Sequence, residues 1–151
     1  MNVPVPRHGE ICCNIAFLVL NHAREHNLGR VIVNDGGVIT EHDPDTVRGP
    51  DVSFYSFARV PRGPLPHGYL DVVPELVFEV RSPTDRWSEM LARASEFLKA
   101  GITVVCLVDE ASEAVHVFRA DEQPRILRAA DELTLPDILG DYRVAVQRFF
   151  E

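Results

Sequence analysis

Two acidic residues stand in this sequence where an apolar strand would be expected to exclude them. Asp51 follows Pro50 at the start of a strand-like segment, and Glu79 lies inside the apolar run of residues 76–80. A carboxylate in a buried strand is costly unless it is paired, protonated or bound to a cation. Asp51 and Glu79 are therefore the first candidates for chemistry.

A shared divalent cation would explain both residues. If the two strands are neighbours, the carboxylates repel each other, and a hard ion such as Mg²⁺ or Mn²⁺ relieves that repulsion because it prefers oxygen ligands. An ion held this way could polarise a phosphodiester and lower the pKa of a bound water. The spacing leaves an alternative open, in which the acids point to solvent or pair with an arginine such as Arg81.

Hydrophobic periodicity predicts the helices and strands that would position these two acids. The predicted helices span residues 10–26 and 87–100, with a short helical turn at 136–139. The predicted strands span 51–57, 75–81 and 103–108, with hairpins joining 30–33 to 38–40 and 115–119 to 125–128, and a final alternating segment at 142–149. This order predicts an α/β or α+β fold, with a mixed sheet flanked by helices.

The bulk properties restrict the class of protein. The length of 151 residues suits one domain, residues 1–151. A net charge of −8 argues against nonspecific nucleic-acid binding but leaves room for a local basic groove. Three cysteines without a framework spacing, and a start that lacks the apolar core of a leader, favour a cytoplasmic protein. The apolar run at residues 11–20 is too short to span a bilayer, so no membrane partner is expected.

Five stretches of the chain form a pattern in a fixed order. They are Arg7-His8-Gly9-Glu10, Arg48-Gly49-Pro50-Asp51-Val52, residues 74–83, residues 101–106 and the turn at 131–136. Together they resemble the Uma-type restriction-endonuclease-like family of bacteria, which belongs to the PD-(D/E)XK nuclease superfamily. The resemblance covers nearly the whole chain, and its most specific part is the Glu-Val-x-Ser-Pro segment that begins at Glu79.

The resemblance implies a restriction-endonuclease-like fold and a set of roles. Asp51 and Glu79 would bind Mg²⁺ or Mn²⁺, the substrate would be a nucleic acid, most simply DNA, and two copies would pair to cut both strands. The signature lysine of this family lies four residues before an aromatic residue of the next helix. Counting back from Phe97, that position holds Arg93, which would complete the catalytic set.

Arg93 is a departure from the family pattern. Arginine keeps the positive charge and can clamp a phosphate, but it is a poor general base because it does not readily lose its proton. Lys99 cannot replace it easily, because six residues correspond to roughly 240° around a helix. The members of the family also usually carry a further strand before the His-Gly segment, with which this chain almost begins.

Three more residues have both a functional and a structural interpretation. Glu10 could be a third metal ligand, although an acid near a helix start also favours the helix dipole. His8 could act in catalysis, but no nucleophile motif accompanies it, which favours a loop or cap role. Trp87 could stack on a base, while its large apolar area favours packing.

Two functions therefore compete on the sequence. The first is a metal-dependent endonuclease that uses Asp51, Glu79 and Arg93. The second is a nuclease-like fold without activity that binds nucleic acid or protein, and Arg93 and the net charge favour it.

Overall fold

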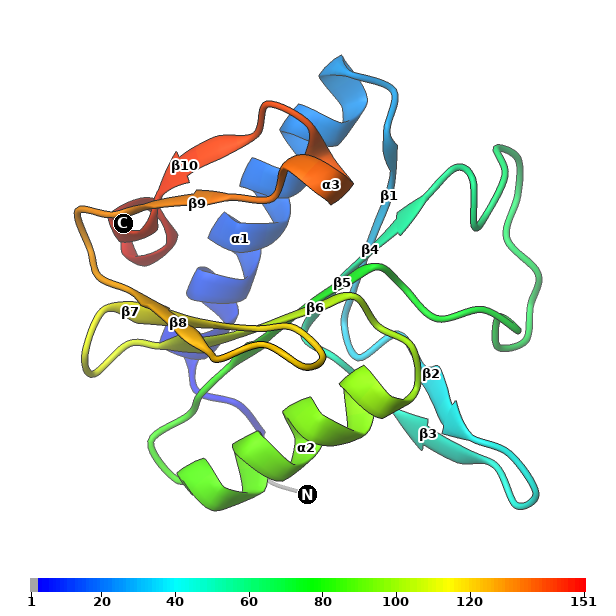
Figure 1. Cartoon of the computed structure of the whole chain (residues 1–151), viewed down its shortest axis with the longest axis horizontal. Helices are drawn as coiled ribbons and strands as arrows, with labels where there is room; N and C mark the ends of the chain where they lie inside the picture. Colours follow the sequence, from blue (N-terminus) through cyan, green and yellow to red (C-terminus); the bar gives the residue numbers. More distant parts are fainter. Residues whose placement is uncertain (1–2) are drawn as a thin grey trace.

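The computed structural model describes residues 3–151 and contains a six-stranded mixed sheet with helices against both faces (Figure 1). The strand order is β1-β4-β5-β6-β7-β8, in which β5 and β6 are parallel and all other neighbours are antiparallel. The strands are β1 (Gly29–Val33), β4 (Val52–Ser56), β5 (Leu76–Val80), β6 (Val104–Asp109), β7 (Ala114–Phe118) and β8 (Arg125–Leu127). The expected mixed sheet flanked by helices is confirmed.

The two long helices lie on opposite faces of this sheet. Helix α1 (Pro6–Glu25) packs in one apolar cluster with side chains of every strand from β4 to β8. Helix α2 (Trp87–Lys99) packs in a second cluster, through Met90, Ala94 and Phe97. Each helix turns one apolar stripe to the sheet, as the helical spacing of its buried residues requires.

Strand β5 is buried on both faces, which explains why its sequence is nearly all apolar. Leu76, Phe78 and Val80 belong to the α1 cluster, and Val77 belongs to the α2 cluster. Successive side chains of a strand point to opposite faces, so Glu79 points to the face that α2 covers.

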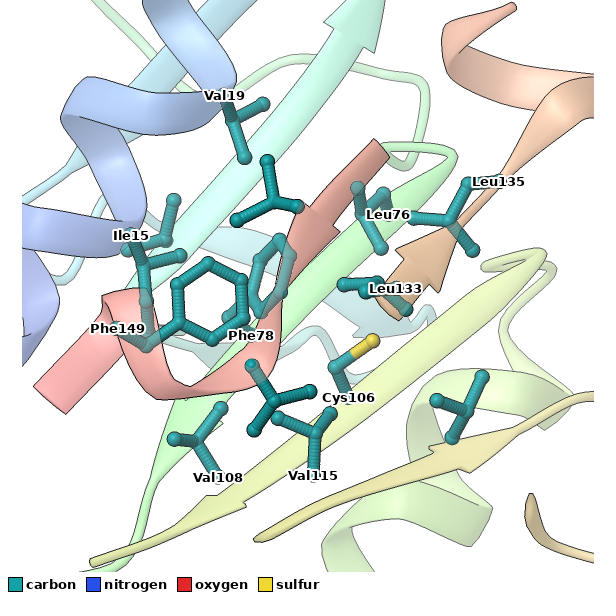
Figure 2. Close-up of a cluster of buried hydrophobic side chains, with 14 of the residues drawn as sticks. Ile15, Val19, Leu76, Phe78, Cys106, Val108, Val115, Leu133, Leu135 and Phe149 are labelled. Carbon is teal, nitrogen blue, oxygen red and sulfur yellow. The ribbon is translucent and has the colours of Figure 1, made fainter. Parts of the chain in front are cut away.

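The last part of the chain completes the core on the α1 face. It comprises β9 (Glu132–Thr134), α3 (Pro136–Leu139), β10 (Arg143–Ala145) and the 3-10 helix η1 (Val146–Phe150), with β9 and β10 paired. Figure 2 shows Phe149 of η1 against Phe78 of β5, and the two ring centroids lie 6.0 Å apart in an edge-to-face arrangement. The sequence predicted a single alternating segment for residues 142–149, which the structure replaces by a short strand and a 3-10 turn.

The hairpin predicted between residues 30–33 and 38–40 is wrong. Strand β1 pairs with β4, and β2 (Val38–Glu41) pairs with β3 (Thr46–Arg48) in a separate ribbon. The turn itself is present, because Asn34 and Asp35 both have left-handed φ angles of 61° and 57°. The chain after it leaves the sheet because Val38 is buried in the cluster of α2.

Other predicted elements are close to the structure. The hairpin of residues 115–119 and 125–128 is confirmed as β7 paired with β8. Helix α1 begins four residues before its predicted start, at Pro6, whose fixed φ suits the first turn of a helix. None of the helices within residues 3–151 combines the length and the apolar character needed to cross a membrane.

Replacing Phe149 should test the packing of the C-terminal segment on the sheet. Phe149 is fully buried, so we expect Phe149→Ala to lower the free energy of unfolding by about 3–5 kcal/mol through lost apolar contact and a residual cavity. Phe17→Ala is the matched control, because Phe17 is 62% exposed on α1 and its loss should change stability by no more than about 0.5 kcal/mol. Denaturant unfolding measures both, and equal effects would contradict the packing described here.

Candidate active site

The ends of β4 and β5 bring Asp51 and Glu79 together. The antiparallel register pairs Val52 with Phe78, and continuing it by one residue places Asp51 opposite Glu79. The backbone N–H of Asp51 donates to Glu79 Oε1 at 3.2 Å, and the backbone N–H of Val80 donates to Asp51 Oδ2 at 2.8 Å. Each carboxylate is thus fixed by the backbone of the neighbouring strand.

Both carboxylates are withdrawn from water. The Glu79 side chain is only 8% exposed and that of Asp51 15%. The pKa of the Glu79 carboxyl is raised to about 7, first by burial and then by the charge of Asp51, against the lowering effect of Arg93. Burial also raises the pKa of the Asp51 carboxyl, although the hydrogen bond from Val80 and the nearby His8 oppose the rise. Because both pKa values are raised, Asp51 and Glu79 lose their two carboxyl protons less readily than isolated carboxyl groups do.

Arg93 reaches this pair from α2. Its Nη1 donates to Glu79 Oε2 at 3.0 Å, while half of its side chain is exposed. Arg93 lies three residues after Met90 and four before Phe97, so it borders the buried stripe and its long stem can lie along apolar surface. Arg93 thus lies beside Glu79, as the catalytic set implied by the family resemblance requires. Lys99, also on α2, is exposed and is not among the residues that line the cavity containing Glu79.

His8 contacts Asp51 from α1, and Cys12 of the same helix contacts His8. His8 Nε2 lies 3.1 Å from Val80 O and 3.4 Å from Asp51 Oδ2. Because the carbonyl oxygen of Val80 can only accept a hydrogen bond, Nε2 carries the hydrogen. His8 Nδ1 lies 3.7 Å from Cys12 Sγ. Burial, and then the charge of Asp51, raise the pKa of the Cys12 thiol to about 12, so the thiol remains protonated and can donate to the ring.

Sequence reasoning left a catalytic role open for His8 but favoured a loop or cap role, whereas the structure places it in α1, beside Asp51. The segment Arg7-His8-Gly9-Glu10 was among the stretches that carried the family resemblance, and this was the one signal that could have identified His8.

A cavity of about 650 Å³ opens over these residues. Asp35 is a further acid in its wall that the sequence analysis did not identify. Gly49 allows Asp35 to approach, because a Cβ at Gly49 would lie 2.8 Å from the Cβ of Asp35. Arg93 is the one lysine or arginine among the described residues that line the cavity, which are Val3, Pro4, Val5, His8, Asp35, Gly49, Asp51, Glu79, Val80, Ser82, Pro83, Thr84, Asp85 and Arg93.

Two residues that the sequence singled out lie elsewhere. Glu10, expected as a possible third metal ligand, pairs with Arg7 at 2.7 Å and is not part of the cavity wall. Trp87 is half-buried, with its ring 4.8 Å from the ring of His116 and 4.9 Å from the guanidinium of Arg81, so it packs rather than presenting a free face.

The oxygen atoms of the pair fit a hard divalent cation. Within residues 3–151 no donor is hydrogen-bonded to Asp51 Oδ1, and Arg93 is the one lysine or arginine that pairs with either carboxylate, through Glu79. Oxygen-rich sites of this kind suit Mg²⁺ or Mn²⁺. The arrangement can also hold an anionic group between the ion and the exposed guanidinium of Arg93.

Comparisons with known proteins agree with this architecture. A solved structure from Anabaena variabilis ATCC 29413, described as "a putative nuclease belonging to DUF820", is similar over 99% of this chain and 83% of that chain, with a TM-score of 0.86. The two share 18% sequence identity, so the similarity establishes the fold alone. No curated protein matches the chain. The model of the Uma2 family, described as "Putative restriction endonuclease", matches residues 1–147, and the chain therefore belongs to the Uma2 family.

Proposed function

We propose that this protein is a metal-dependent endonuclease that hydrolyses phosphodiester bonds of nucleic acid, most simply DNA. The observation that carries the proposal is the buried pair of Asp51 and Glu79, which faces a cavity together with Arg93. The membership of the Uma2 family supports the same class of reaction.

Asp51 and Glu79 would hold one Mg²⁺ or Mn²⁺ ion through their carboxylate oxygens. When bound, the ion would supply Lewis-acid chemistry, which stabilises charge on a phosphoryl oxygen and lowers the pKa of a water molecule. The reciprocal backbone hydrogen bonds keep both carboxylates in place before the ion arrives. His8 would position Asp51 through its Nε2 hydrogen.

Arg93 would bind a phosphate oxygen of the substrate. It pairs with Glu79 in the absence of substrate, and its exposed side chain can turn toward the cavity. Because the chain carries a net charge of −8 and the cavity wall is acidic, a phosphodiester would approach only if cations are present. Arg93 would neutralise developing charge on the phosphate but would not remove a proton from the attacking water.

A second candidate function is an inactive nuclease-like module that binds nucleic acid or protein. The specific observation in its favour is that an arginine stands where the family pattern expects a lysine. A homodimer, in which each copy would cut one DNA strand, is expected only if the protein is an active endonuclease.

Removal of either carboxylate should abolish cleavage. We expect Asp51→Asn and Glu79→Gln to lower the rate of DNA cleavage in Mg²⁺ or Mn²⁺ by at least about a hundredfold, the scale on which loss of a charge-stabilising group acts. Asp121→Asn, at an exposed turn, is the control and should cleave like the parent protein. A parent protein that binds divalent ions but cuts no nucleic acid would instead favour the inactive module.

Substitutions of Arg93 separate a phosphate-binding role from a structural one. We expect Arg93→Lys to keep or raise activity because it retains a cation at the position where the family pattern has lysine, and Arg93→Ala to lose it. Lys99→Ala is the matched control on the same helix, where the side chain is exposed and outside the cavity wall. Cleavage by Arg93→Ala at the rate of the parent would remove Arg93 from the catalytic set.

The raised pKa of Glu79 predicts a pH-dependent stability. The carboxyl has a pKa of about 7 in the fold against 4.5 when unperturbed, so the folded state holds its proton more tightly. Its contribution to stability is present at low pH and is lost as the pH rises through about 7. Without divalent ions, the parent protein should therefore lose more thermal stability than Glu79→Gln between pH 5 and pH 8.

Divalent ions should reverse this trend, because protons compete with the ion for the carboxylate. The rise in melting temperature that Mg²⁺ or Mn²⁺ causes should be larger at pH 8 than at pH 5 in the parent and small at both values in Glu79→Gln. A metal-induced shift that is independent of pH, or that survives in Glu79→Gln, would count against a metal held by this residue.

A further inference from the structure

Two histidines and an aspartate meet at the end of α1 that lies away from the candidate active site. His22 lies in the last turn of α1, His26 directly follows that helix, and Asp141 lies in the turn between α3 and β10. These parts of the chain lie close together in Figure 1. At 1.5 Å per residue, His22 is roughly 21 Å along the helix from His8, so the cluster is separate from the Asp51 site.

The distances in this cluster are close to those between ligands of one ion, with the three ligand atoms all within 4.8 Å of one another. Asp141 Oδ1 lies 3.8 Å from His22 Nε2 and 3.5 Å from His26 Nε2. Both distances are longer than an ordinary hydrogen bond of about 2.7–3.2 Å. Two ligands at roughly 2.0–2.1 Å from a tetrahedral zinc ion lie roughly 3.3–3.4 Å apart. Small rotations of the exposed Asp141 and His26 side chains would bring all three atoms to one ion.

His26 is already oriented as a ligand. Its Nδ1 lies 3.0 Å from the backbone oxygen of His22, which can only accept, so Nδ1 carries the hydrogen. In the neutral ring, Nε2 then has a free lone pair and lies toward Asp141. Metal-binding histidines commonly donate their second N–H to a backbone carbonyl in this way.

His22 is held in place by its surroundings. Its ring stacks on His26 with centroids 4.2 Å apart and meets the edge of Tyr142 at 5.2 Å. Its Nε2 donates to Leu139 O at 2.6 Å, so an ion would replace that hydrogen and the ring would carry its proton on Nδ1 instead. Leu139 O keeps a donor, the backbone N–H of Tyr142 at 3.3 Å.

We propose that His22, His26 and Asp141 bind one transition-metal ion of the zinc class, with water completing the coordination. Two imidazoles and one carboxylate suit Zn²⁺, Co²⁺, Ni²⁺ or Cu²⁺, whereas the all-oxygen pair at Asp51 and Glu79 suits Mg²⁺ or Mn²⁺. The carbonyl end of a helix also favours a positive charge. The ion joins α1 to a turn more than a hundred residues later, so it would stabilise the fold as a structural site.

Zinc titration of the full chain tests this site. All proteins carry Asp51→Asn, which removes the carboxylate of the other group that could take zinc, formed by His8, Cys12 and Asp51. In this background we expect one Zn²⁺ ion to bind by calorimetry and to raise the melting temperature. Adding His26→Ala or Asp141→Asn should weaken zinc binding by at least about tenfold. Loss of a group that only hydrogen-bonds a metal ligand already lowers metal affinity by about that factor, and loss of the ligand itself should lower it at least as much. Both side chains are exposed, so these variants should fold, and unfolding without metal verifies it.

Cobalt and a control histidine complete the experiment. Co²⁺ should give the visible absorption of a four-coordinate ion in the Asp51→Asn protein and lose it in the His26→Ala variant. His67→Ala, in an exposed loop, should change neither the zinc affinity nor this spectrum. Equal zinc affinity with and without His26→Ala and Asp141→Asn would overturn the proposal.

Discussion

The candidate active site depends on the reciprocal hydrogen bonds between the ends of β4 and β5. The backbone of Asp51 donates to Glu79, and the backbone of Val80 donates to Asp51, so each carboxylate replaces a carbonyl acceptor of the sheet ladder. This keeps two negative groups beside each other in a place that water barely reaches. Arg93 and His8 meet the carboxylates there, and burial together with the charge of Asp51 raises the pKa of Glu79.

The acidic pair and its arginine could be predicted because their signals are local. Glu79 interrupts an apolar strand, and alternation within that strand fixes the face on which it lies. Arg93 was identified by the family resemblance, and helical spacing between Met90 and Phe97 then places it at the border of the buried stripe. The periodicities of strands and helices depend only on residues close together in the chain, so they can be recognised in the sequence before the fold is known.

The pairing of β1 and the contact of His8 with Asp51 depend on residues far apart in the chain. Asn34 and Asp35 do form a turn, but β4 offers β1 a longer partner than β2, and Val38 gains burial against α2. The alternation of apolar residues along a strand predicts which of its faces is buried, but it does not predict which strand pairs with it. Contacts of this kind are set by the packing of the whole sheet, which local patterns do not encode.

The acidic pair is difficult to explain as a device for stability. A buried and a half-buried carboxylate, with one half-exposed arginine paired to Glu79, cost desolvation and mutual repulsion. A packed apolar pair would fill the same space without that cost. The cavity beside them would hold a cation, while the acids at its wall would exclude an anion that arrives alone. The divalent ion of the proposed function would remove both difficulties, because it would neutralise the pair and, with Arg93, make the cavity attractive to a phosphate. The electrostatic cost of the site is therefore best understood as preparation for a ligand that the fold itself does not provide.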